Sequence, residues 1–180
     1  MQFLVNPNGN PPQTLPESFR KLLNLSSGFC RSWTNQELSD AQATSEEAFE
    51  VLDHIQNELL RHRDDKRNDP NWSSHPLKVA LSLPVGSLIK NATSYKQNFL
   101  SLSPGNGALP ASVPVEPLSL EVALNKLKHR ASIAVNFSIT NSNSHSLYIF
   151  TNAGMGQPDS ISEFNMDVFC NVGKQAANAI

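Results

Sequence analysis

The sequence predicts an α+β fold, in which an N-terminal helical layer of about four helices and one edge strand packs on a C-terminal three-stranded antiparallel sheet. Apolar residues mostly recur every three or four positions in the first two thirds of the chain, which is the period of a helix. In the last third they alternate, which is the period of a strand. The 180 residues are enough to bury a core and favour one domain, expected over residues 14–180.

The composition excludes several classes of function. The 14 Lys and Arg residues against 16 Asp and Glu give a formal net charge of -2, so no broad basic surface for nucleic acid is expected. The first residues do not have the pattern of a signal peptide, so none is expected, and no apolar run approaches the roughly 18 residues of a membrane span. We therefore expect a soluble, intracellular protein, located in the cytoplasm (the host cytoplasm if it comes from a pathogen) and not secreted by the Sec route.

The chain begins with a segment that disfavours regular structure. Residues 1–13 contain Asn-Pro-Asn-Gly-Asn-Pro-Pro, which predicts a flexible arm. Thr14 and Glu17 then form a capping-box pattern with Pro16 in the first turn, so a short helix is expected to follow. The Ser-Ser-Gly run at residues 26–28 is expected to end that helix.

Two further capping-box patterns follow, at Thr34 and Thr44. The second one predicts the clearest helix of the chain, over about residues 45–64. Apolar side chains at spacings of four, three and four give this helix one buried stripe: Ala48, Leu52, Ile55 and Leu59.

The middle of the chain alternates between patterns. Apolar residues at every second position between two prolines predict an edge strand over residues 77–83. A helix is predicted over residues 87–100 from apolar spacings of four, three and four. The long loop at 101–117 contains four prolines and two glycines. Ser119 can then cap a helix over residues 120–129.

The last third predicts three antiparallel strands. Residues 133–139 alternate between apolar and polar, and residues 145–151 continue after the turn residues 141–144, so the two segments form a β-hairpin. A third alternating run, over residues 164–172, predicts another strand. Cys170 is expected to face the core from this strand.

The candidate catalytic group consists of Cys30, His145 and Asp159. A cysteine nucleophile needs a base to form the thiolate and a third group to orient that base. In papain-like cysteine hydrolases the cysteine belongs to the helical half and the histidine begins a strand of a later sheet, which is the order seen here. The only other cysteine, Cys170, lies far along the chain, so neither a disulfide scaffold nor a cysteine-based zinc site is expected.

A local pattern supports this candidate. Gly28-Phe29-Cys30, with Trp33 downstream, resembles the Gly-x-Cys pattern of bacterial effector proteases in the papain-like clan. Asp159 follows His145 by 14 residues (159 − 145), which is similar to the His-to-Asp interval of those enzymes. The resemblance implies that Cys30 is the nucleophile, His145 the base and Asp159 the orienting group.

Other observations leave a plainer interpretation open. Asn24 could supply an oxyanion-hole amide, but the predicted cap at Thr34 starts a helix after Cys30, whereas a nucleophile should lie at a helix N-terminus. In the alternative interpretation, Cys30 is a small buried apolar residue and His145 a polar hairpin residue.

Two other groups of polar residues are candidate binding sites. His54, Glu58 and His62 are four residues apart and could offer ligands to a transition metal, but the two histidines lie about 12 Å apart along a helix, so a solvated helix face is the preferred interpretation. The basic residues at 126–130 suit the C-terminal end of a helix dipole. No nucleotide, dinucleotide or metalloprotease motif is present, so no cofactor and no metal are expected.

The sequence therefore favours a non-enzymatic protein–protein interaction or assembly protein, which binds a protein partner or self-associates into an oligomer. A small viral structural protein and a pathogen effector fit this description equally well. The alternative is a papain-like cysteine hydrolase or deamidase that uses Cys30, His145 and Asp159.

Overall fold

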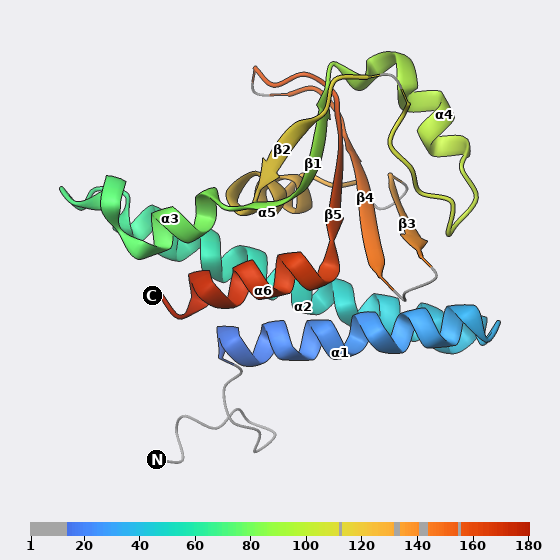
Figure 1. The fold of residues 1–180 in the computed structure, drawn as a ribbon, viewed down its shortest axis with the longest axis horizontal. Coiled ribbons are helices and arrows are strands. Elements are labelled where there is room, and N and C mark those ends of the chain that lie inside the picture. Colours follow the sequence, from blue (N-terminus) through green and yellow to red (C-terminus); the bar gives the residue numbers. More distant parts are fainter. Residues whose placement is uncertain (1–13, 112, 132–133, 141–143, 155) are drawn as a thin grey trace.

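The computed structural model describes residues 14–111, 113–131, 134–140, 144–154 and 156–180. Within these residues the chain forms six α-helices and a five-stranded antiparallel sheet (Figure 1). The α+β class is confirmed, but the sheet has five strands where three were predicted. The predicted flexible arm, residues 1–13, lies outside the described residues.

Helices and strands are mixed along the chain. The α-helices are α1 (Leu15–Thr34), α2 (Leu38–Lys66), α3 (Pro76–Ser82), α4 (Lys96–Ser101), α5 (Leu120–Lys128) and α6 (Met166–Ala177). Two short 3-10 helices are η2 (Trp72–Ser74) and η3 (Ala92–Tyr95). The strands are β1 (Pro84–Lys90), β2 (Glu116–Ser119), β3 (Val135–Ile139), β4 (His145–Thr151) and β5 (Ser160–Asn165). Their order across the sheet is β2-β1-β5-β4-β3.

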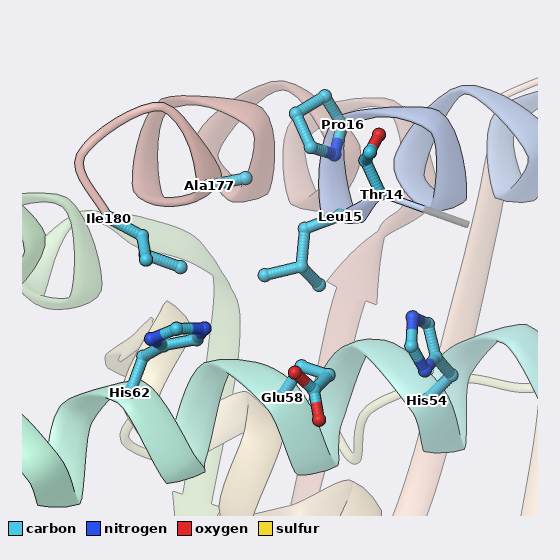
Figure 2. A pocket seen from close by; sticks show the side chains of 8 residues that line it. All are labelled: Thr14, Leu15, Pro16, His54, Glu58, His62, Ala177 and Ile180. Carbon is cyan, nitrogen blue, oxygen red and sulfur yellow. The ribbon is translucent and has the colours of Figure 1, made fainter. Parts of the chain in front are cut away.

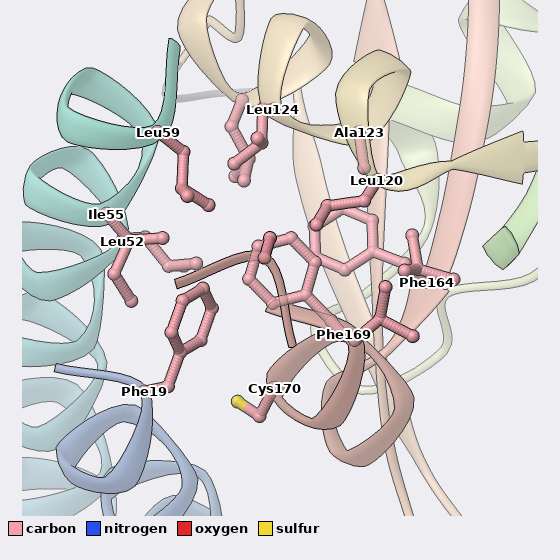
Figure 3. Close-up of a cluster of buried hydrophobic side chains, with 14 of the residues drawn as sticks. Phe19, Leu52, Ile55, Leu59, Leu120, Ala123, Leu124, Phe164, Phe169 and Cys170 are labelled. Carbon is pink, nitrogen blue, oxygen red and sulfur yellow. The ribbon is translucent and has the colours of Figure 1, made fainter. Parts of the chain in front are cut away.

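The main core lies between one face of the sheet and five helices, α1, α2, α3, α5 and α6. Leu147 and Ile149 of β4 point into it. Three phenylalanines, Phe19, Phe164 and Phe169, meet at its centre (Figure 3), with ring centroids 6.1 Å apart for Phe19 and Phe169 and 5.2 Å apart for Phe164 and Phe169. This core joins α1 and α2 to the C-terminal strands and α6.

A smaller apolar cluster covers part of the other face of the sheet. Tyr148 and Phe150, which alternate with the core residues of β4, pack there with Ile89, Ile161 and Phe99 of α4. The predicted loop at 101–117 contributes to this cover and ends in β2.

Buried Asn136 fixes that loop against β3. Its amide group donates to the carbonyls of Leu102 and Ser103, and its carbonyl oxygen accepts the backbone N–H of Gly105. The Gly107 N–H donates to the carbonyl of Phe137, so part of the open edge of β3 is paired with the loop.

The predicted end of the first helix at residues 26–28 is wrong. The helix continues to Thr34 because Phe29 and Cys30 extend its buried face, and the hydroxyl of Ser27 is satisfied by the carbonyl of Leu23. Thr34 is therefore the last residue of α1 and does not cap a following helix.

The predicted helix at 45–64 lies inside a longer one. α2 begins at Leu38, and Thr44 is an interior residue whose hydroxyl donates to the carbonyl of Asp40. The predicted stripe is confirmed in its centre, since Leu52, Ile55 and Leu59 are buried.

The strand predicted at 77–83 is a helix, α3. Leu77 and Leu81, one helical turn apart, are buried, while Val79 between them is 54% exposed. His75 caps this helix by accepting the N–H of Leu77. The helix predicted at 87–100 is wrong in its first part, which is β1, and Asn91 has a positive φ of 57° that interrupts a helix there. Its second part is helical, as η3 and α4.

In the last third of the chain, the predicted helix and hairpin are confirmed, whereas the predicted third strand is only partly correct. Ser119 caps α5 as predicted, and the hairpin of β3 and β4 is confirmed by the pairing of Val135 with Ile149, although residues 132–133 and 141–143 lie outside the described part. The strand predicted at 164–172 is wrong beyond Asn165, which ends β5 and caps α6 by accepting the N–H of Val168. Cys170 does face the core, but from a helix.

Candidate functional site

His145 belongs to an aromatic group at the junction of α1 with the hairpin. Its Nδ1 lies 2.8 Å from the hydroxyl oxygen of Ser26, one helical turn before Cys30 on α1. Its ring stacks on Phe29, with centroids 5.1 Å apart, and meets the edge of Phe137. Its Nε2 is buried and has no hydrogen-bond partner among the described residues.

Asp159 is not brought to His145. The Asp159 carboxylate accepts the hydroxyl of Thr93 and the N–H of Ala153, and these two bonds lower its pKa. Residue 160 pairs with the last residue of β4, whereas His145 is the first residue of that strand. At about 3.3 Å per residue, the two ends of β4 lie about 20 Å apart.

The surroundings of Cys30 do not favour a thiolate. The side chain is 2% exposed, and burial, helped by the carboxylate of Asp167, raises the pKa of the thiol to about 11. Burial lowers the pKa of His145 to about 4, so its ring is neutral at pH 7. An activated cysteine–histidine pair needs the opposite shift on the thiol. The proposed oxyanion residue, Asn24, is exposed on α1.

The second candidate site is a cavity of about 280 Å³ between α2, the start of α1 and the end of α6 (Figure 2). One wall comes from α2 and carries His54, Glu58 and His62. The facing wall carries Thr14 and a largely apolar group consisting of Leu15, Pro16, Ala177 and Ile180. The three polar residues are half-buried, so they do not form an open, fully solvated helix face.

The polar wall contains one unsatisfied atom. Glu58 accepts a hydrogen bond from Arg61, with Nη2 and Oε2 2.7 Å apart, and this bond lowers the pKa of Glu58. Arg61 Nη2 also lies 3.3 Å from Nε2 of His62. By contrast, Nε2 of His54 is buried without a partner among the described residues. Among all the residues that the structure describes, no group of three or more His, Cys, Asp or Glu side chains is placed to hold a metal ion.

A third group consists of the basic residues at the end of α5 and their partners, which the sequence analysis did not bring together. Lys126 of α5 lies 2.6 Å from the hydroxyl oxygen of buried Ser160, and burial, helped by the nearby charge of Lys90, lowers the pKa of Lys126. Arg130, from the same basic cluster, forms a two-pronged ion pair with Asp53. The sequence pattern placed these cations at a helix end but gave no signal of the strand register or helix packing that supplies their partners.

Comparison of the chain with protein-family models, curated proteins and solved structures finds no match in any of the three. Among the helices of the described residues, none is both long and apolar enough to cross a membrane. Function is therefore inferred from the chemistry of the residues themselves.

Proposed function

We propose that this protein is a non-enzymatic protein–protein interaction or assembly protein, and that the cavity between α1, α2 and α6 receives an apolar side chain of another polypeptide. The observation that carries this proposal concerns His54, which lines the cavity: its Nε2 is buried and has no hydrogen-bond partner within the part of the chain that the structure describes. Nearly all buried polar atoms in proteins have a partner, so a bound group that completes this hydrogen bond would stabilise the site.

The chemistry of the two walls suits a polypeptide. The apolar wall of α1 and α6 can pack on an aliphatic or aromatic side chain, and the α2 wall can bond a peptide N–H or carbonyl (Figure 2). A volume of about 280 Å³ is at the small end for a ligand pocket and fits one or two side chains. Insertion of such an anchor residue is a common source of binding energy at protein interfaces.

The hydrolase or deamidase alternative receives less support. Its nucleophile, Cys30, has a pKa raised to about 11, and its orienting group, Asp159, bonds to Thr93 and Ala153 at the far end of β4. The geometry around His145 instead favours a role in packing α1 against the hairpin.

The test is the molar mass in solution as a function of protein concentration, measured by light scattering. We expect the mass of the unmodified chain to rise from one copy towards two. Ala177→Trp places an indole into the cavity and should hold the mass at one copy, whereas Gln175→Trp, at an exposed position of the same helix, should behave like the unmodified chain. A mass of one copy at every concentration would contradict the assembly proposal.

A further inference from the structure

We propose that Lys126, Lys90, Ser160 and Thr151 form a binding site for a phosphate group at one end of the sheet. None of these four residues lines the cavity between α1, α2 and α6, so the inference goes beyond the proposed function and does not depend on it. Ser160 is the central residue. It pairs with Lys90 of β1 on one side and with Thr151 of β4 on the other, since β5 lies between these two strands (Figure 1).

The strand register places these side chains on one face of the sheet. Leu88 and Ile149, two residues before Lys90 and Thr151, point into the main core. Because side chains alternate between the two faces with a period of two, Lys90 and Thr151 lie on this same face, and so does Ser160 between them. The Cβ atoms of directly paired residues are about 5 Å apart, so the three residues form a continuous row at the edge of the core.

The row offers hydrogen-bond donors. Lys126, from the helix α5 that packs on this face, donates to Ser160, with Nζ and Oγ 2.6 Å apart. This bond leaves the other N–H groups of Lys126 and the O–H of Ser160 free to donate. Thr151 is only 8% exposed, and its hydroxyl is buried without a partner in the described part of the chain. The oxygens of an anion would accept from all of these groups.

The positive charge of this group is only partly neutralised. Lys90 pairs with Glu116, with Nζ and Oε2 2.7 Å apart. Lys126 forms no ion pair with any residue that the structure describes. The carboxylate of Asp159, the neighbour of Ser160 in the chain, is already occupied by two hydrogen bonds. Burial, helped by the charge of Lys90, lowers the pKa of Lys126, and an anion between the two ammonium groups would be stabilised by both.

The arrangement of the donors favours phosphate over a carboxylate. Lys90, Ser160 and Thr151 donate from the sheet, whereas Lys126 donates from the helix packed on it, so the four groups do not lie in one plane. A carboxylate offers two oxygens in a plane. A phosphate group offers more acceptor oxygens, arranged tetrahedrally, and carries more negative charge.

The test is a titration of the full chain with inorganic phosphate at neutral pH and constant ionic strength. NMR follows the Cε and Hε signals of Lys126 and the amide signals of Ser160 and Thr151, and we expect shifts that saturate. Lys126→Met should weaken binding by about tenfold or more, because a bond between two charged groups is lost. Lys128→Met, at an exposed position of the same helix, is the matched control and should bind like the unmodified chain.

Thr151→Val separates binding from folding. Valine has nearly the shape of threonine but no hydroxyl group. Removal of an unpartnered buried hydroxyl should leave the midpoint of urea unfolding unchanged or raise it, and should weaken phosphate binding by about fivefold. A lowered midpoint would show that the hydroxyl is used within the folded chain itself, which would contradict the proposal.

The choice of anion decides the rest. Shifts that do not saturate with phosphate, or equal binding by Lys126→Met, overturn the proposal. Acetate that binds as tightly as phosphate would assign the site to a carboxylate and overturn it as well. Phenyl phosphate distinguishes two sources of the same ligand chemistry: binding as tight as that of inorganic phosphate supports the phosphate group of a larger molecule, and weaker binding supports the free ion.

Discussion

The hydroxyl oxygen of Ser26 lies 2.8 Å from Nδ1 of His145, which joins two residues 119 positions apart in the chain. This contact connects the middle of α1 to the first residue of β4, and the stacking of His145 on Phe29 adds to it. The imidazole must stay neutral in this position, because burial opposes its charge. His145 is thus placed to hold the helical layer against the hairpin.

The buried imidazole predicts a loss of stability in acid. The pKa of His145 is lowered from 6.5 to about 4 in the folded chain, so between these pH values the unfolded state binds more protons than the folded state. The free energy of unfolding should therefore fall as the pH drops through this range, by about 3 kcal/mol from this residue.

Urea unfolding at pH values above, within and below this range measures the effect. His145→Gln should show a smaller loss in acid than the unmodified chain, because glutamine does not titrate. His129→Gln, at an exposed position, should keep the full loss. Parallel pH profiles for the unmodified chain and His145→Gln would show that His145 is not the group responsible.

Two glycines in helices should respond to alanine in opposite directions. A Cβ at Gly173 of α6 would lie 2.1 Å from the ring of Phe19, whereas at Gly28 of α1 the nearest atom would be 3.8 Å away, on Thr44. Gly173→Ala should therefore destabilise the chain by about 1–3 kcal/mol through overpacking. Gly28→Ala should stabilise it by about 0.5–1 kcal/mol through helix propensity.

Urea unfolding of both variants and of the unmodified chain measures these two effects as shifts of the unfolding midpoint. Both variants replace a helical glycine with alanine, so the gain in helix propensity is the same. The difference between their midpoint shifts therefore reports how tightly α6 packs against α1 at Gly173. Equal shifts in the two variants would contradict the close contact between Phe19 and Gly173.

The sequence was sufficient to predict a helix or strand where the capping residues and the spacing of apolar residues indicated the same element. The cap at Ser119 and the alternation of β3 and β4 predicted α5 and the hairpin. Alternation misled at 77–83 and 164–172, because short amphipathic helices bury residues one turn apart and can still carry apolar residues at every second position. Asn165, which caps α6, was the local signal that the strand interpretation overlooked.

The candidate site was visible only in part. The spacing of His54, Glu58 and His62 placed them on one side of a helix, and this side is one wall of the cavity. The opposite wall comes from the two ends of the described chain, at Leu15 and Ala177, and its position depends on how α1 and α6 pack. No pattern along the chain encodes that packing directly.

The most direct test of the non-enzymatic account is the rate at which Cys30 and Cys170 are alkylated as the pH is raised from neutral, in the folded chain and in His145→Ala. Burial raises the pKa of Cys30 to about 11 and that of Cys170 to about 12, so we predict that both thiols are silent until the chain is denatured. In His145→Ala, joint acceleration at both cysteines would report opening of the fold. A Cys30 that reacts below the usual thiol pKa of about 8.5, while Cys170 stays silent, and that loses this reactivity in His145→Ala, would contradict the account and support the cysteine hydrolase.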